Sequence, residues 1–135
     1  MSKSALYTAN TSAQNVAING IINPGTIIRR YGPNVTLSGN AIQISGAGYY
    51  DIDSSFTVAP TAAGNVTITA YLNNIPIPGA IATETATAAN DIINLSLSAI
   101  VRQACECCEG VSNLTFVLTG TASSVTNSAI VVEKL

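Results

Sequence analysis

The chain has 135 residues and a net charge of -2, and only 9% of its side chains are charged, against about 25% in a typical soluble domain. This length fits one domain with a substantial hydrophobic core, so we expect a single domain over residues 1–135. Such a charge balance provides no basic field for binding nucleic acid, because the only cationic cluster is Arg29–Arg30.

Two further classes are excluded by the absence of long apolar runs. No stretch approaches the roughly 18 apolar residues of a membrane span, and the first residues lack the apolar core of a signal peptide. We therefore expect cytoplasmic synthesis and no membrane insertion, and residues 1–14 could form an extended N-terminal arm. A surface this poor in charge protects a monomer weakly against association, which favours a homo-oligomer.

Glycine, proline and asparagine divide the first third of the chain into brief β-compatible segments. These cover residues 15–18, 26–29, 35–37 and 41–44. Each is short, so the pattern predicts short strands or extended segments.

The clearest strand of the sequence covers residues 48–58. Its even positions form one mostly apolar face, made of Tyr50, Ile52, Ser54, Phe56 and Val58. The odd positions place Asp51, Asp53, Ser55 and Thr57 on the other face. A period of two over this length is typical of a half-buried β-strand.

Alternation returns at residues 65–72 after a turn, which predicts an antiparallel pair with the preceding strand. Asn73 and Asn74 begin a tight turn. The prolines of residues 75–79 cannot donate to a ladder, so this segment must be an edge strand or an extended loop. The stretch 80–89 is weakly patterned and is expected to be a loop or an irregular strand.

Three more strands are predicted at residues 93–99, 113–119 and 129–135, and only residues 86–93 offer a weak helix candidate. The chain thus contains about eight to ten short strands separated by turn signals. The fold class is all-β, an antiparallel β-sandwich of the jelly-roll type with little or no helix.

The order of these segments resembles the trimeric jelly roll shared by the tumour-necrosis-factor (TNF) and C1q families. Their bacterial and phage members include the C-terminal domain of exosporium glycoproteins. The segment from Gly48 through Tyr50 to Ile52 fits a Gly-x-Tyr-x-(Ile/Phe) strand of that family, and residues 71–79 fit its turn ending in Pro-Gly. Asn74 stands where the family often has glycine. The resemblance spans roughly residues 49–135 and implies a TNF/C1q-like homotrimer, with the last strand at the centre of the assembly.

The sequence contains few residues suited to catalysis or metal binding. Histidine is absent, which removes the commonest general base and metal ligand, so we expect no enzyme and no catalytic residue. Asp51 and Asp53 share a strand face and could bind Ca²⁺ with carbonyl oxygens, although a solvated face explains them more simply. No cofactor is required by this composition.

Three thiols lie within four positions, at Cys105, Cys107 and Cys108. As thiolates they could chelate Zn²⁺, but three ligands are too few for a closed tetrahedral site unless Glu106, Glu109 or a neighbouring subunit adds one. Cys105 and Cys108 could instead form a disulfide, and a loop with unpaired thiols remains the simplest interpretation.

Six residues are candidates for a subunit interface or a ligand-facing surface: Tyr49, Asp51, Asp53, Tyr71, Arg29 and Arg30. The arginine pair could grip an acidic or carboxylate partner, or it could be an ordinary solvated pair at a strand end. Tyrosines could stack on sugar rings if several converge, or could fill core and rim positions.

The leading interpretation is a non-enzymatic structural protein. It would be a homotrimer on a tailed-phage virion, of the capsid-decoration or head-fibre type, or in a similar extracellular surface assembly. Its partners would be copies of itself and capsid or other assembly proteins. The alternative is a carbohydrate-binding adhesin on a phage, spore or cell surface, with glycans as ligands.

Overall fold

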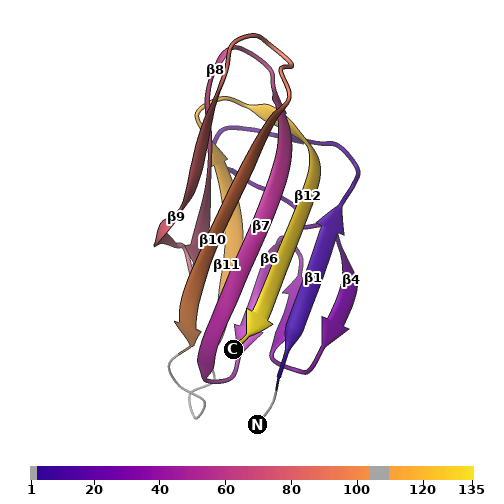
Figure 1. Cartoon of the computed structure of the whole chain (residues 1–135), viewed down its shortest axis with the longest axis vertical. Helices are drawn as coiled ribbons and strands as arrows, with labels where there is room; N and C mark the ends of the chain where they lie inside the picture. The colour runs from indigo at the N-terminus through magenta and orange to yellow at the C-terminus, as the bar shows by residue number, and fades with distance from the viewer. Residues whose placement is uncertain (1–2, 104–109) are drawn as a thin grey trace.

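The computed structural model describes residues 3–103 and 110–135 and folds them into two β-sheets packed face to face (Figure 1). Sheet A contains β1 (Ala5–Asn10), β2 (Gln14–Val16), β4 (Thr26–Tyr31), β7 (Gly48–Pro60), β10 (Ile93–Gln103) and β12 (Ser123–Lys134). Sheet B contains β3 (Gly20–Ile21), β5 (Val35–Ser38), β6 (Ala41–Ser45), β8 (Gly64–Leu72), β9 (Ile75–Ala86) and β11 (Val111–Thr119).

Every strand pair in the described residues is antiparallel. Sheet A has the order β10-β7-β12-β1-β4, with β2 added to β12, and sheet B has the order β5-β6-β11-β8-β9, with β3 added to β11. Successive strands repeatedly change sheets, which is the wiring of a jelly roll. The predicted all-β sandwich is confirmed, and the described part of the chain contains no helix.

The core lies between the inner faces of β7 and β11. On β7, the predicted apolar face is confirmed, because Tyr50, Ile52, Phe56 and Val58 are at most 1% exposed. The rings of Phe56 and Phe116, one from each sheet, lie 5.4 Å apart between centroids at an interplanar angle of 56°. A tilted aromatic pair of this kind bridges the two layers of the sandwich.

The predicted pairing of residues 48–58 with residues 65–72 is wrong. Strand β7 pairs with β10 and β12 in sheet A, whereas β8 pairs with β9 and β11 in sheet B. In the connection between them, the backbone N–H and Oγ1 of Thr61 both donate to the carbonyl of Ala122. This anchors the chain beside the β11–β12 connection, so it crosses to the other sheet and does not fold back as a hairpin.

Strand β9 begins with a two-residue hairpin turn, because Leu72 and Ile75 are paired across Asn73 and Asn74. Both asparagines have positive φ, 54° and 67°, as a type I′ turn requires. The proline-containing segment that follows lies at the edge of sheet B, as predicted. The weakly patterned stretch after it continues as part of β9 to Ala86.

The N-terminal segment contributes a strand inside a sheet. Within residues 1–14, which could have formed an arm, Ala5–Asn10 forms β1 between β12 and β4. Since β1 and β12 are antiparallel and Ala5 is paired with Glu133, the start of β1 and the end of β12 lie at the same end of the sandwich (Figure 1).

The Tyr50 side chain closes the turn that leads into β7. Its hydroxyl lies 2.8 Å from the carbonyl oxygens of Ser45 and Gly46 and donates to them. The residue is fully buried, and desolvation raises the pKa of the phenol. The hydroxyl therefore satisfies backbone acceptors that would otherwise be shielded from water.

We expect Tyr50→Phe to lower the free energy of unfolding by about 1–3 kcal/mol, because it removes the hydroxyl donor from the carbonyl of Gly46. The carbonyl of Ser45 keeps the Nδ2 donor of Asn34. The measurement is urea unfolding followed by circular dichroism. Tyr71→Phe, on the outer face of sheet B, is the matched control and should change stability little. Equal effects of the two substitutions would contradict this account of the turn.

Candidate interaction surface

Four of the six candidate residues lie on the outer face of sheet A: Tyr49, Asp51, Asp53 and Arg29. Alternation along each strand turns Asp51, Asp53 and Ser55 of β7 away from the core, and the neighbouring strands contribute their own outward residues. Those outward neighbours are mostly small, hydroxylated or apolar: Ser96, Ser98, Ile100, Ala129, Val131, Ala5 and Tyr7. Three are notably exposed for apolar or aromatic side chains: Ile100 at 61%, Val131 at 38% and Tyr7 at 37%.

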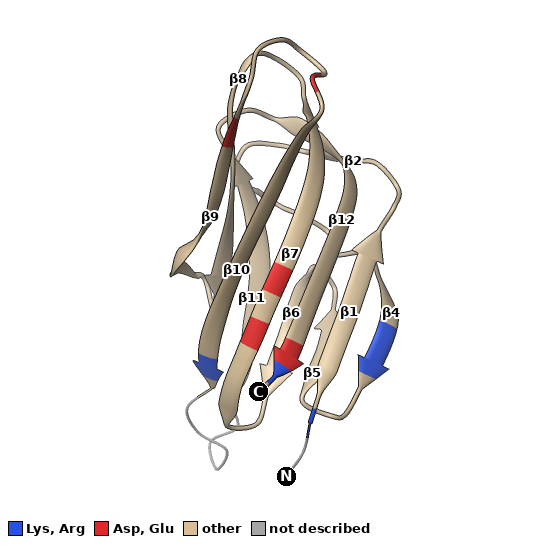
Figure 2. Cartoon of the chain, viewed as in Figure 1, with Lys and Arg blue, Asp and Glu red and all other residues tan. Residues whose placement is uncertain are grey.

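Three carboxylates lie together in this setting and are called the acidic patch: Asp51, Asp53 and Glu133. Asp51 is paired directly with Glu133 on β12, and Asp53 follows two positions along β7 on the same face. Figure 2 shows two acidic segments on β7 and one at the end of β12. Like charges placed directly opposite each other on neighbouring strands destabilise a sheet.

The electrostatics of Asp51 reflect this crowding. Its pKa is raised, first by desolvation and then by the charges of Asp53 and Glu133, while a backbone hydrogen bond at Ile52 acts in the opposite direction. A raised carboxyl pKa means that Asp51 adds stability only at acidic pH and loses that contribution as pH rises through its folded-state pKa.

The arginine pair lies at the far edge of the same sheet, on β4 (Figure 2). All six residues of β4 are exposed. Arg29 is paired with Tyr7 and so shares the outer face, where its Nη1 donates to the carbonyl of Ile28 at 2.8 Å. Arg30 turns the other way, and its Nε donates to the carbonyl of Val35 in β5 at 2.9 Å. Only Arg29 is thus directed along the face that carries the acidic patch.

The tyrosines do not converge on one binding platform. Tyr49 is 55% exposed on the outer face of sheet A beside Arg102, whereas Tyr71 lies on the outer face of sheet B. Tyr50 is buried in the core. Tyr7 and Tyr31 line a shallow depression of about 190 Å³ near the β4 edge.

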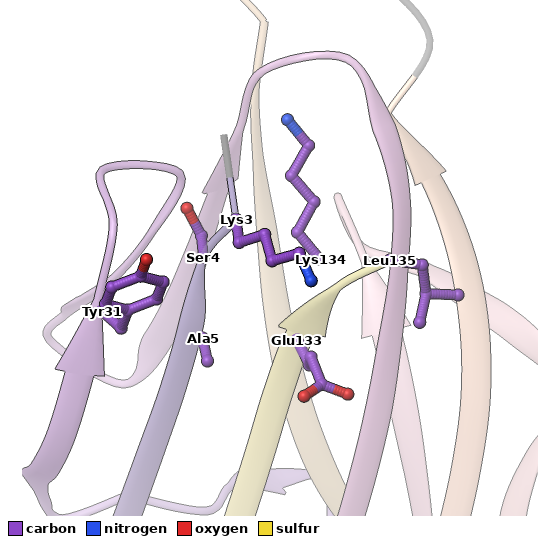
Figure 3. Close-up of a pocket in the computed structure, with 7 residues that line it drawn as sticks. All are labelled: Lys3, Ser4, Ala5, Tyr31, Glu133, Lys134 and Leu135. Carbon is purple, nitrogen blue, oxygen red and sulfur yellow. The ribbon is translucent and has the colours of Figure 1, made fainter. Parts of the chain in front are cut away.

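A larger cavity of about 430 Å³ opens where the first and last strands meet (Figure 3). Figure 3 shows Lys3, Lys134 and Glu133 at its rim, with the Tyr31 ring to one side. The cavity is therefore lined by charges of both signs.

The described residues contain no group of three or more His, Cys, Asp or Glu side chains arranged to hold a metal ion. The candidate ligands Cys105, Cys107 and Cys108 lie outside the described residues. Within residues 3–103 and 110–135, no helix is long and apolar enough to cross a membrane.

Sequence reasoning missed Glu133, Ile100, Val131 and Tyr7 as members of this surface. Alternation in the last strand places Glu133 and Val131 on the face opposite Ile130 and Val132. What the sequence lacked was the strand order, because only the pairing of β12 with β7 brings Glu133 beside Asp51.

No family model and no curated protein matches this sequence. Solved structures do match it in fold. Murine APRIL superposes with a TM-score of 0.70 at 8% identity, over 99% of this chain and 100% of that one. The globular domain of zebrafish complement 1qA gives 0.63 at 6% identity, over 97% and 95% of the two chains.

PRD1 vertex protein P5 superposes with a TM-score of 0.63 at 16% identity, over 98% of this chain and 96% of that one. The resemblance drawn from the strand at residues 48–58 and the turn after residue 72 is therefore confirmed at the level of fold. The chain has the TNF/C1q-like jelly-roll fold.

Proposed function

We propose that the chain is a non-enzymatic structural protein that assembles as a homotrimer on the surface of a virion, of the capsid-decoration or head-fibre type. The observation that carries this proposal is the outer face of sheet A. That face exposes Ile100 on the edge strand β10 and, side by side on β12 and β1, Val131 and Tyr7, in a chain whose side chains are only 9% charged. Exposed apolar surface of this kind marks an interaction site.

The fold likeness supports the same assignment. Among its structural neighbours is a protein described as a vertex protein, and the family resemblance in the sequence implies a trimer. A head-to-tail contact, in which one surface of a copy meets a different surface of the next, closes into a ring when the rotation between copies allows it. Three copies in such a ring would cover a large part of sheet A.

We expect native mass spectrometry and light scattering of the full chain to give three times the 13.8 kDa chain mass. The species should persist on dilution through the micromolar range, because buried apolar surface holds it together. A monodisperse monomer under the same conditions would contradict the proposed homotrimer.

The virion setting is tested separately, by the genes beside its own and by particle composition. Neighbouring genes for portal, capsid or tail proteins, together with detection of the chain in purified particles, would support the assignment. A spore-coat or secretion cluster would overturn it, whatever the oligomeric state.

A further inference from the structure

The acidic patch places like charges side by side on the outer face of sheet A. Asp51 and Glu133 face each other directly on neighbouring strands, and Asp53 adds a third carboxylate on the same face. Within one copy, Lys3 and Lys134 line the same cavity as Glu133, and Arg102 lies diagonal to Asp51 on β10. The residues paired with Asp53, in contrast, are the uncharged Ser98 and Val131. Repulsion of this kind is tolerated more readily if an external positive charge offsets it.

The β4 edge (Thr26–Tyr31) has the complementary character. It is an edge strand with every residue exposed, and Ile27 and Ile28 are 40% and 42% exposed. An exposed apolar edge strand is a template for association, which proteins usually block. Here the edge carries Arg29, whose planar guanidinium can pair with two carboxylate oxygens at once.

Within one copy these two surfaces cannot meet. Asp53, Val131, Tyr7 and Arg29 stand in one row across sheet A, each paired with the next. Three strand spacings of about 4.8 Å separate the first from the last, or about 14 Å between their backbones. Val131 and Tyr7 fill the interval.

We propose that the acidic patch of one copy receives the β4 edge of a second copy, with Arg29 of the incoming edge paired to the patch carboxylates. This inference rests on the proposed homotrimer and names the contact that holds it together. The two surfaces are complementary in charge, and both are flanked by apolar side chains: Ile100 and Val131 beside the patch, Ile27 and Ile28 on the edge.

The contact is head-to-tail, since the patch and the edge are different surfaces of the same chain. Each copy therefore offers one patch and one edge, and a closed ring uses all of them. Charge complementarity also fixes the register, because any sliding of the edge along the sheet leaves carboxylates unpaired.

The test uses charge reversal in the full chain. Asp51→Lys/Asp53→Lys reverses the patch, Arg29→Glu reverses the edge, and Glu84→Lys on the edge strand of sheet B is the matched control. Each of the first two variants should raise the dissociation constant of the assembly about tenfold or more. The three substitutions combined should restore most of the wild-type affinity, because the opposite charges face each other again.

The readout is the dissociation constant from sedimentation equilibrium, with circular dichroism and thermal melting to verify that each variant folds. A monomeric wild type would contradict the homotrimer and this inference together. A trimeric wild type whose affinity is unchanged by either reversal, or a combined variant that fails to recover although it folds, would overturn only this contact.

The pH dependence of assembly provides an independent test of the pairing between Arg29 and the patch. The titratable and charged groups around the patch are its three carboxylates, Lys3 and Lys134 beside Glu133, Arg102 on β10, the phenols of Tyr49 and Tyr7, and the incoming Arg29. An arginine beside the carboxylates lowers their pKa in the assembly, so the separated copies bind more protons.

The wild-type assembly should therefore weaken as pH falls through the carboxylate range, about pH 5 to 4, and the Asp51→Lys/Asp53→Lys variant should lose most of this dependence. Assembly that tightens on acidification would mean that the carboxylates are buried without a cation, and would overturn the pairing with Arg29.

Discussion

The rest of the molecule depends on strand β7. It is hydrogen-bonded to a neighbouring strand on each side, and one of its faces packs in the core while the other forms part of the outer surface. Its pairing with β10 and β12 spans nearly its whole length. Its inner face supplies Tyr50, Ile52 and Phe56 to the core. Its outer face supplies Asp51 and Asp53 to the acidic patch. A change in its register by one residue would exchange these faces, so core and surface are fixed by the same ladder.

The scarcity of charge gives the remaining charged groups unusual weight. With 12 charged residues in the chain, three carboxylates on neighbouring positions of one sheet and an arginine at its edge form a dipolar surface. In a chain of ordinary composition such a pattern would be lost among many solvated ion pairs. On the outer face of sheet A, the carboxylates lie on the inner strands, Arg29 lies at the β4 edge and Arg102 lies at the β10 edge, so a second copy can use both the patch and the β4 edge.

Much of the fold follows from local alternation and turn chemistry. The two faces of residues 48–58, the Asn73–Asn74 turn and the strand at residues 113–119 could all be predicted, because period and turn residues are properties of neighbouring positions. Which strands pair with each other could not be predicted. The sequence suggested a hairpin of β7 with β8, and it gave no sign that Glu133 lies opposite Asp51, because both depend on contacts between distant segments. The candidate surface was therefore predicted in part, residue by residue, but not as a patch.

In the proposed homotrimer, copies of this chain meet across the outer face of sheet A. Hydroxyl-radical footprinting of the assembled protein tests it most directly, with Tyr7, Ile100 and Val131 as reporters and the exposed Ile18 and Ile21 as references. We expect the three reporters to be protected in the assembly and to become reactive when dilution separates the copies, while the references react equally in both states. Reporters that react as readily in the assembly as in separated copies would contradict it.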